Sequence, residues 1–493
     1  MFRSSNYVIL ETRKKISSIT LASRRQTRFR PRTIDKRLKG NAAMKNEEKL
    51  RDAPVFRLIL SMSLPMVLVM LVNVLYNMAD VFFMGRTGNT MAVAGVSLTS
   101  PVFSGISAFN TLIGFGGCTA VSIALGKGNH DIVRKYTSFV TYAALGLGVV
   151  LTVLLLSFSE GLLSILGTNE ETRQHAKDYL EILALGAPFM LTAGALGNTI
   201  RADGESRAPM LVALLTNGLN IALDALFILR LDWGAKGAAA ATVISNAVNF
   251  IIVLIIAARK PSFSLSPKDF TLRPQVSLNV LSLGVPMAAG TLLMSIAHIF
   301  SNRLMVQYGN MAVAAGSAAG KVSMLIPMII MGICMGVQPA MSYAYGMQDR
   351  ERLHRIALGT GLFALLFGVF LSVFSVAFRS QLITFFLPDP EVLELGKRMI
   401  IGHVVSVPVY AVYQMCSCYL QSVGSVQKAT ITSLLRQGIV FIPVVYAMNA
   451  LFQLDGMIFS SAVVDVISTA IALFLCFRAS ASMANKNPAT AIS

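Results

Sequence analysis

The chain has 493 residues, of which 54% are apolar and only 13% are charged. A soluble domain carries about a quarter charged residues, so this composition predicts an integral membrane protein for which lipid is part of the solvent. The net charge of +18 is concentrated in the basic segment Met1–Ala43 and in loops, which indicates anionic lipid headgroups rather than nucleic acid as a partner.

Residues 1–54 are predicted to form a basic tail. Met1–Ala43 is rich in Arg and Ser and lacks the apolar core of a secretory signal, so we expect this segment to be disordered. Met44 begins the sequence Met-Lys-Asn-Glu-Glu, and we expect native translation to start there. The alternative is a genuine basic extension that is held at anionic lipid.

Twelve apolar stretches follow, each long enough for a helix that crosses the membrane. They are Val55–Gly85, Met91–Leu125, Arg134–Ser159, Tyr179–Ile200, Ala208–Leu229, Gly234–Ala258, Leu278–Val306, Met311–Ala344, Leu353–Phe378, Met399–Leu420, Ala429–Leu451 and Gly456–Phe477. A proline inside a helix removes a hydrogen bond and kinks it, which predicts kinks at Pro65, Pro188, Pro286, Pro339 and Pro408.

The two halves of the chain repeat each other. Gly126 matches Gly346 and Pro188 matches Pro408, each at an offset of 220 residues. Six spans per unit is an even number, so both units cross the membrane in the same sense. The predicted fold is therefore all-α, with twelve transmembrane helices in two parallel, pseudo-symmetric lobes and a site between them near mid-membrane. The predicted divisions are a tail at 1–54, an N-lobe at 55–258, a linker at 259–277, a C-lobe at 278–477 and a second tail at 478–493.

Lys and Arg are more frequent in the loops on the side of the two termini, and Arg201 is counted among them. Loops rich in these residues stay in the cytoplasm. The prediction is a multi-pass protein of the cell membrane with both termini and the linker in the cytoplasm.

Polar residues at bilayer depth are costly and are functional candidates by default. On the first, fifth and sixth spans they form stripes at helical spacing, made of Asn73, Tyr76, Asn77 and Asp80, of Asn217, Asn220 and Asp224, and of Thr242, Asn246 and Asn249. Carboxylates, amides and hydroxyls on converging helices suit a hard cation or a protonation site. The alternative is hydrogen bonding between helices, which accounts for the Asn and Thr residues better than for two aspartates.

The second half lacks acids at the matching positions. Its stripe on the seventh span consists of Ser295, His298 and Asn302, and Val444 stands where the first half has Asp224. An ion site like that of the N-lobe is therefore not predicted there.

Lys321, Arg436 and Asp465 remain as a polar network of the second half. The simplest interpretation is an ion pair between Asp465 and one of the two bases. His298 and His403 could titrate near neutral pH, although a lone histidine in a membrane is more often a hydrogen-bonded structural residue.

Motifs of soluble catalysis are missing from the sequence. It contains no GxxxxGK[ST] phosphate loop, GxSxG or HExxH motif, so neither ATP drive nor an enzyme is indicated. The five cysteines form no CxxC or Cys/His cluster, and no metal centre is predicted beyond a possible Na⁺ at the N-lobe stripes.

Several segments resemble the multidrug and toxic compound extrusion (MATE) family. Residues 75–88 (LYNMADVFFMGRTG), 116–129 (GGCTAVSIALGKGN), 201–210 (RADGESRAPM), 220–228 (NIALDALFI), 234–243 (GAKGAAAATV) and 336–346 (GVQPAMSYAYG) are similar to its motifs, in order and at the right spacing. The resemblance covers nearly all of the chain from about Met44 to Phe477.

The resemblance implies a V-shaped pair of six-helix lobes that exchange an organic solute for H⁺ or Na⁺ by alternating access. By position it places the cation and proton site of the N-lobe on Asp80, Asn220, Asp224 and Thr242. Some branches also use acids on the seventh and tenth helices. Here the seventh has none and Glu394 lies just outside the tenth, so a second ion site is not expected.

The predicted function is export of organic, cationic and amphipathic compounds by a monomeric antiporter that needs no cofactor besides its coupling ion. A flippase for a lipid-linked precursor and a channel are the alternatives. The sequence does not choose between H⁺ and Na⁺ or name the substrate.

Overall fold

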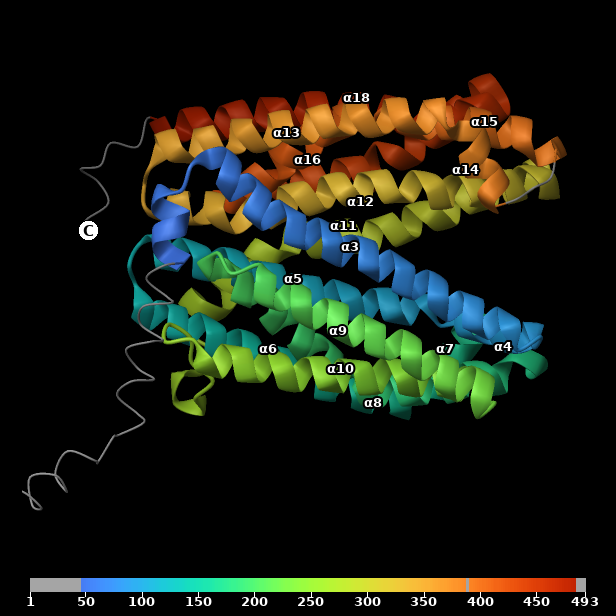
Figure 1. Ribbon diagram of the computed structural model, residues 1–493, viewed down its shortest axis with the longest axis horizontal. Coiled ribbons are helices and arrows are strands. Elements are labelled where there is room, and N and C mark those ends of the chain that lie inside the picture. Colours follow the sequence, from blue (N-terminus) through green and yellow to red (C-terminus); the bar gives the residue numbers. More distant parts are fainter. Residues whose placement is uncertain (1–45, 387–389, 485–493) are drawn as a thin grey trace, which may run out of the picture. The chain divides into compact units, whose positions relative to one another are not determined.

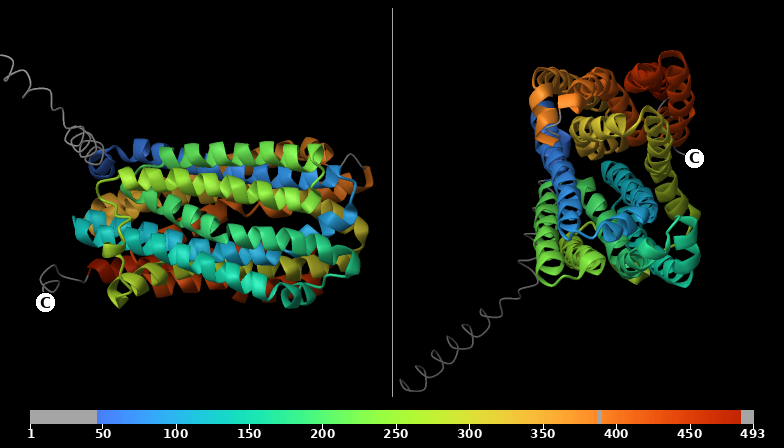
Figure 2. Two further views of the ribbon diagram at one scale, coloured as in Figure 1. Left: turned by 90° about the horizontal axis from the view of Figure 1, so that it is seen from below. Right: turned by 90° about the vertical axis from the view of Figure 1, so that its right-hand side faces the viewer.

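The computed structural model describes residues 46–386 and 390–484, in which every regular element is a helix. The expected disorder of Met1–Ala43 and the expected start at Met44 lie outside these residues. The helices form two lobes, and their arrangement is seen in Figures 1 and 2.

The N-lobe contains the six spans that precede the linker. Its elements are α3 (Val55–Arg86), α4 (Thr90–Leu98), α5 (Ser100–Gly126), α6 (His130–Ser157), α7 (Ser159–Ile165), α8 (Glu170–Ile200), α9 (Arg207–Asp224), the π-helix η2 (Ala225–Arg230) and α10 (Gly234–Arg259). The second predicted span is divided at Thr99 into α4 and α5, because Pro101 cannot continue the hydrogen bonding of the helix before it.

The C-lobe follows the same plan. Its elements are α11 (Pro274–Met305), α12 (Asn310–Gly346), α13 (Arg350–Ala377), α14 (Arg379–Phe386), α15 (Pro390–Val404), α16 (Val407–Ser422), α17 (Val426–Leu434), the π-helix η5 (Leu435–Ile439) and α18 (Phe441–Ala484). Pro408 lies in the first turn of α16 rather than inside a span, so the tenth predicted span is two helices instead of one kinked helix.

Eleven helical segments of the described chain are long and apolar enough to cross a membrane, and the last of them, Val426–Met483, has 58 residues. This segment contains two of the predicted spans. Gln453 has a non-helical backbone, with φ 53° and ψ −131°, and Gly456 packs against the carbonyl of Met448. Residues eight apart in a straight helix are separated by about 12 Å, so the chain turns back at Gln453. All twelve predicted spans are thus present.

The duplication is visible in local structure. α6 and α13 both have 28 residues, and their N-cap residues Asn129 and Asp349 accept hydrogen bonds from the backbone N–H groups of Ile132 and Arg352. Such caps satisfy a backbone donor that the first turn of a helix leaves free. The two caps are 220 residues apart, which confirms the predicted repeat.

The first helix of each half also packs on the other half. α3 contacts α12 as well as α9, and α11 contacts α5 as well as α17. The approach is close: a Cβ atom on Gly336 would lie 2.6 Å from the carbonyl oxygen of Met62, and Ser63 donates a hydrogen bond to the carbonyl of Ile333 at 3.2 Å. Figure 1 shows α3 beginning beside α13 and ending beside α4.

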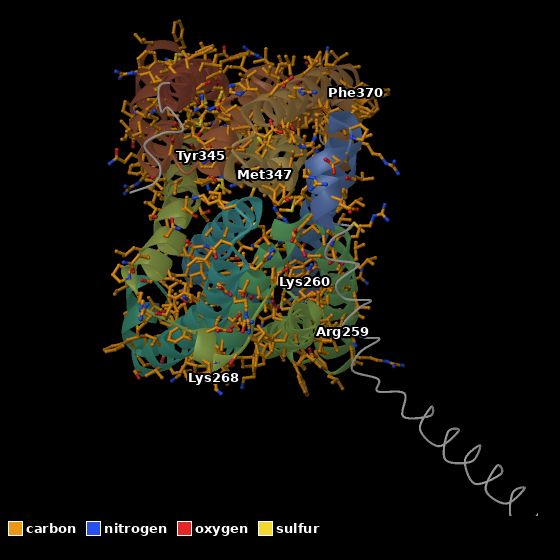
Figure 3. The ribbon with its side chains drawn as sticks, turned by 90° about the vertical axis from the view of Figure 1, so that its left-hand side faces the viewer. Arg259, Lys260, Lys268, Tyr345, Met347 and Phe370 are labelled. Carbon is orange, nitrogen blue, oxygen red and sulfur yellow. The ribbon has the colours of Figure 1, made fainter. Side chains whose placement is uncertain are left out.

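The outer face of the bundle is apolar. On α13, Leu358, Leu362, Leu366 and Phe370 recur every four residues and are 58–73% exposed. Phe370 is labelled on the outside of the C-lobe in Figure 3. A stripe of this kind is stable only when lipid covers it.

The linker between the lobes is tied to the N-lobe. Lys260, which is mostly buried, contacts the carboxylate of Asp203 and that of Glu205, the latter at 2.7 Å. Tyr142 of α6 donates to the carbonyl of Leu265 at 2.8 Å. Figure 3 looks at this end of the bundle, where Lys260 and Lys268 of the linker and Met347 after α12 are labelled. The coloured ribbon also begins and ends at this end of the bundle in Figure 1.

Candidate functional site

Three helices of the N-lobe carry the polar residues that sequence analysis selected. α3 provides Asn73, Tyr76, Asn77 and Asp80, α9 provides Asn217, Asn220 and Asp224, and α10 provides Thr242, Asn246 and Asn249. α9 packs against both of the other helices. The three predicted stripes therefore meet inside one lobe.

Asn220 connects Asp224 to α10. Its amide nitrogen donates to Asp224 Oδ2 at 3.0 Å, and its amide oxygen accepts from the backbone N–H of Thr242 at 3.2 Å. Asp224 is fully buried, and Asn220 and Thr242 are almost so. The arrangement fixes one oxygen of the carboxylate and leaves the other available.

Asp80 lies close enough to Asp224 for the two carboxylates to interact electrostatically. Atom Oδ1 of each is buried and has no hydrogen-bond partner among the described residues. Burial of an ionised carboxylate with an unsatisfied oxygen costs several kcal/mol or more. A proton or a small cation bound at these oxygens would reduce that cost.

The other predicted residues support this geometry. Asn217 donates to Asn73 Oδ1 at 2.8 Å, which joins α9 to α3. Asn77 and Asn246 donate to the carbonyls of Asn73 and Thr242, one turn earlier in their own helices, at 2.6 and 2.9 Å. Part of the stripe therefore serves helix packing, the alternative considered for the Asn residues.

A cavity of about 410 Å³ lies next to the two acids and is called the N-lobe cavity here. The predicted residues that line it are Asn73, Tyr76, Asn77, Asn217, Asn220, Asn246 and Asn249. Asp80, Asp224 and Thr242 are not part of its wall. Asn220 therefore lines the cavity and also hydrogen-bonds Asp224 and Thr242, which lie behind the wall.

Asp224 is the last residue of α9, and η2 begins with the next residue. In a π-helix the hydrogen bonds span five residues, and such segments are frequent at functional sites. In the C-lobe, Arg436 lies in η5, the corresponding π-helix. The sequence does not reveal these segments, because their composition does not differ from that of an α-helix.

In the C-lobe the structure brings Arg436 and Asp465 together. Arg436 Nε lies 2.8 Å from Asp465 Oδ1, and Ser406 donates to Asp465 Oδ2 at 2.7 Å. The guanidinium carbon of Arg436 also lies 4.4 and 5.1 Å from the ring centroids of Tyr410 and Tyr413. Every oxygen of this carboxylate therefore has a partner, unlike those of the N-lobe acids.

The remaining polar residues of the C-lobe fall into two groups. Lys321, His298 and His403 line a second cavity together with Arg436 and Asp465. Glu394 instead lies in an exposed ion pair with Lys397 at 2.7 Å. Glu394 thus does not join the buried pair.

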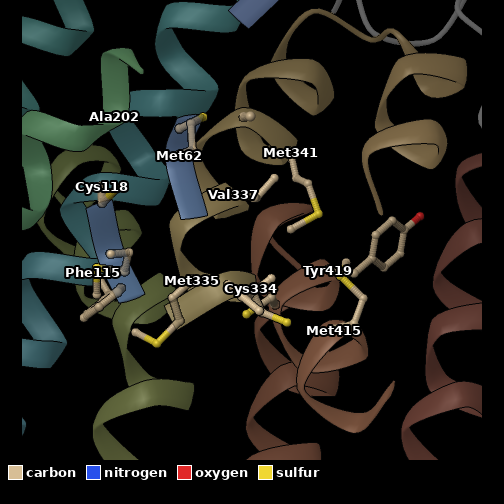
Figure 4. Close-up of a cluster of buried hydrophobic side chains, with 14 of the residues drawn as sticks. Met62, Phe115, Cys118, Ala202, Cys334, Met335, Val337, Met341, Met415 and Tyr419 are labelled. Carbon is tan, nitrogen blue, oxygen red and sulfur yellow. The ribbon is translucent and has the colours of Figure 1, made fainter. Parts of the chain in front are cut away.

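Arg201 is a residue that sequence analysis misplaced. It was counted as a loop residue, but it is only 5% exposed and lies between the lobes. It donates to the carbonyl of Met335 on α12 at 2.8 Å and lies over the ring of Phe115 at 5.6 Å. Figure 4 shows Phe115 and Met335 in the apolar cluster that joins the two lobes here. The sequence does not indicate this contact, because Arg201 lies in the polar segment 201–206.

Glycines bring the lobes together at the same end. Gly126 at the end of α5 packs against the carbonyl of Tyr343, and Gly346 at the end of α12 packs against the carbonyl of Ile123. Either position is too close for a side chain. The two glycines, matched across the repeat, therefore let the ends of α5 and α12 pack directly against each other.

Comparisons with known proteins agree with this architecture. The MatE family model matches twice, at residues 65–226 and 286–447. The multidrug export protein MepA of Staphylococcus haemolyticus (strain JCSC1435) is 29% identical over 437 residues, which are 88% of this chain and 96% of MepA. MepA of Staphylococcus aureus (strain MRSA252) is also 29% identical, over 440 residues and the same shares.

Among solved structures, a MATE protein in complex with MaL6 superimposes with a TM-score of 0.85 at 24% identity, covering 90% of this chain and all of the other. The two matches of the family model lie in the two lobes, and together they span more than half of the chain. This chain therefore belongs to the MatE family of membrane transporters.

Proposed function

We propose that the protein is a secondary antiporter that exports amphipathic organic cations in exchange for H⁺ or Na⁺ by alternating access. The curated relatives of similar length are named as multidrug export proteins, which supports organic cargo. We further propose that it acts as a monomer in the cell membrane with both termini in the cytoplasm.

The observation that carries the proposal is the pair of unpartnered oxygens on Asp80 and Asp224. Two acids that repel each other in a water-poor lobe favour uptake of a proton or cation. Asn, Thr and carboxylate oxygens are suitable ligands for Na⁺, and the carboxylates alone are sufficient for H⁺.

Asn220 supplies the connection between ion and substrate. It hydrogen-bonds Asp224 and Thr242 and also lines the N-lobe cavity. When an ion binds at Asp224, the amide must adjust, and the wall of the cavity changes with it. Antiport requires ion binding to lower the affinity for substrate, and because linkage between two sites is reciprocal, substrate then lowers the affinity for the ion by the same factor.

The test is transport by the purified protein in proteoliposomes with separately imposed pH and Na⁺ gradients. We expect a cationic dye to accumulate against its own gradient when one of the two ions runs in the opposite direction. Dissipation of gradients without uphill movement would identify a channel and refute antiport. In equilibrium binding, the affinity for the dye should fall as the coupling ion is added.

A further inference from the structure

The C-lobe contains the larger cavity, of about 720 Å³, called the C-lobe cavity here. Cavities that hold drug-sized molecules have volumes of about 300–1,000 Å³. Much of its wall is methionine, including Met287 and Met294 of α11 and Met324, Met328 and Met331 of α12. Methionine side chains adjust to ligands of different shape, so the wall suits varied apolar molecules.

The two cavities differ in the acids that lie at them. Among the described residues, the wall of the N-lobe cavity contains Arg201 and no carboxylate, but Asp80 and Asp224, each with an unpartnered oxygen, lie behind it. Asp465 is the only carboxylate among the described residues of the C-lobe cavity's wall, and Arg436 neutralises it at 2.8 Å. A buried carboxylate held by a guanidinium and a hydroxyl has little attraction left for a second cation. A positively charged ligand would also be repelled by Arg436.

Arg436 occupies the aromatic surfaces as well. Tyr410 and Tyr413 line the cavity, and the faces of aromatic rings attract cations. Both rings already interact with the guanidinium of Arg436. Two rings and a carboxylate could recognise an organic cation. The guanidinium of Arg436 already interacts with all three.

Two hydroxyl groups in the wall have no partner. Ser323 Oγ and Ser461 Oγ are buried and make no hydrogen bond within the described chain, and Ser323 is 6% exposed. Both residues line the C-lobe cavity. A buried hydroxyl without a partner costs about 1–3 kcal/mol, so a ligand with a carbonyl or hydroxyl group would be stabilised here.

We propose that the C-lobe cavity is a second ligand site, which binds aromatic, drug-sized molecules that carry a hydrogen-bonding oxygen and no positive charge. Under the proposed function the cation binds in the N-lobe cavity, beside Asp80 and Asp224, and the uncharged molecule would bind in the C-lobe cavity. That the bound molecule is cargo rests on the proposed function, whereas binding itself does not.

The test compares Nile red with Nile blue, dyes that share one ring system. Nile red is uncharged and has a carbonyl where Nile blue has a cationic nitrogen. Binding is measured by equilibrium dialysis against the protein in nanodiscs, with empty nanodiscs subtracted. No ion gradient is present, so the result does not depend on antiport.

Two glycines give matched variants. A Cβ atom on Gly320 in the C-lobe cavity, or on Gly197 in the N-lobe cavity, would have no neighbour within 4 Å. A side chain that begins at either position would extend toward the cavity that the glycine lines. We expect Gly320→Phe to weaken Nile red binding at least tenfold and to change Nile blue binding less than twofold. Gly197→Phe should weaken Nile blue binding at least tenfold and change Nile red binding less than twofold. Nile red binding that survives Gly320→Phe, or that is lost equally in both variants, overturns the proposal.

The ion pair gives an independent test. Arg436→Met exposes Asp465 and the two tyrosine rings, and we expect it to create Nile blue binding that Gly197→Phe does not remove. Arg436→Met combined with Asp465→Asn removes both charges, a change that buried ion pairs often tolerate. The double variant should again prefer Nile red, and a preference for Nile blue in it would contradict the inference. If uphill export fails but Gly320→Phe still weakens Nile red binding, antiport is refuted and the C-lobe site is not.

Discussion

Asp80 and Asp224 are the residues at which loss of a single charge should stop transport. Asparagine has nearly the same shape but neither takes up a proton nor supplies a negative charge. We expect Asp80→Asn and Asp224→Asn each to abolish uphill export in proteoliposomes while the protein still inserts and elutes as a single species.

Asp455→Asn is the matched control, because Asp455 is 51% exposed and pairs with Arg398 at the surface. It should transport like the unmodified protein. Full export by both variants of the buried acids would remove these residues from the coupling site.

Lys260 offers a prediction about stability. Burial lowers its pKa, but the carboxylates of Asp203 and Glu205 outweigh burial, so its pKa is raised. Removing one partner of a buried ion pair leaves charge uncompensated and costs about 3–5 kcal/mol. We expect Lys260→Met to lower the thermal midpoint in detergent, and the additional changes Asp203→Asn and Glu205→Gln to restore part of the loss.

The pH dependence of the stability that Lys260 contributes follows from the direction of its pKa shift. A base whose pKa is raised on folding contributes stability that is complete below its ordinary pKa of 10.5 and is lost only as the pH rises through the raised value. The difference between the unmodified protein and the triple variant Lys260→Met, Asp203→Asn and Glu205→Gln, in which no carboxylate of the cluster can titrate, should therefore stay constant from about pH 6 to pH 9. A difference that disappears within this range would show that the ion pair is not its cause.

At the scale of single residues, the sequence identified the N-lobe candidates because a carboxylate in an apolar helix is rare and costly. It could not show which oxygen of Asp224 lacks a partner, since that depends on the orientation of Asn220. Arg201 was misplaced for a related reason. Its burial comes from contacts with Met335 and Phe115, which are remote in sequence.

At the scale of elements, α5 and α12 meet through Gly126 and Gly346 with no space for a side chain. Overpacking such a contact costs about 1–3 kcal/mol, and 1.4 kcal/mol is a factor of ten in an equilibrium. We expect Gly126→Leu and Gly346→Leu each to destabilise the closed contact and to reduce export by about tenfold. The measurement is initial uptake into proteoliposomes at equal protein content.

Gly146→Leu is the control for these variants, because a Cβ atom on Gly146 of α6 would meet nothing within 4 Å. It changes a glycine of the same lobe at a position with free space. Equal losses in all three variants would show that leucine in a helix, and not the contact between the lobes, impairs transport.

The predicted spans correspond to the observed helices because each needs a long apolar stretch, which composition alone reveals. The short helices α7 and α14 were missed, since they connect spans and have no membrane-length pattern. The turn at Gln453 was correctly anticipated as a boundary between two spans, although a left-handed φ of 53° at a glutamine has no signature in the sequence.

At the scale of the whole molecule, the orientation in the membrane is still a prediction. The linker follows α10 at the end of the bundle where both ends of the described chain lie. We expect a single cysteine at Ser262→Cys, in a cysteine-free background, to react in intact cells only with membrane-permeant reagents. Labelling by an impermeant reagent would reverse the assignment of both termini.

The two lobes share a plan but not a charge pattern. The N-lobe contains two acids that each have a buried Oδ1 atom without a partner in the described chain, and the C-lobe buries one acid that Arg436 satisfies. Met70 and Phe115 line both cavities, so the two cavities share part of a wall. Duplication preserved the helix caps and the glycine contacts, which the backbone requires, whereas the polar residues of the two lobes diverged.

The packing of α3 on α12 also affects how the protein is made. Ser63 and Ile333, which hydrogen-bond in the finished protein, are 270 residues apart. A ribosome adds about 5–20 residues per second, so this part of α3 is made roughly 14–54 s before its partner has been synthesised. During that interval the Met62 face of α3 is covered by lipid or by the insertion machinery. The packing of α3 is therefore completed only after translation has passed the middle of the C-lobe's second span.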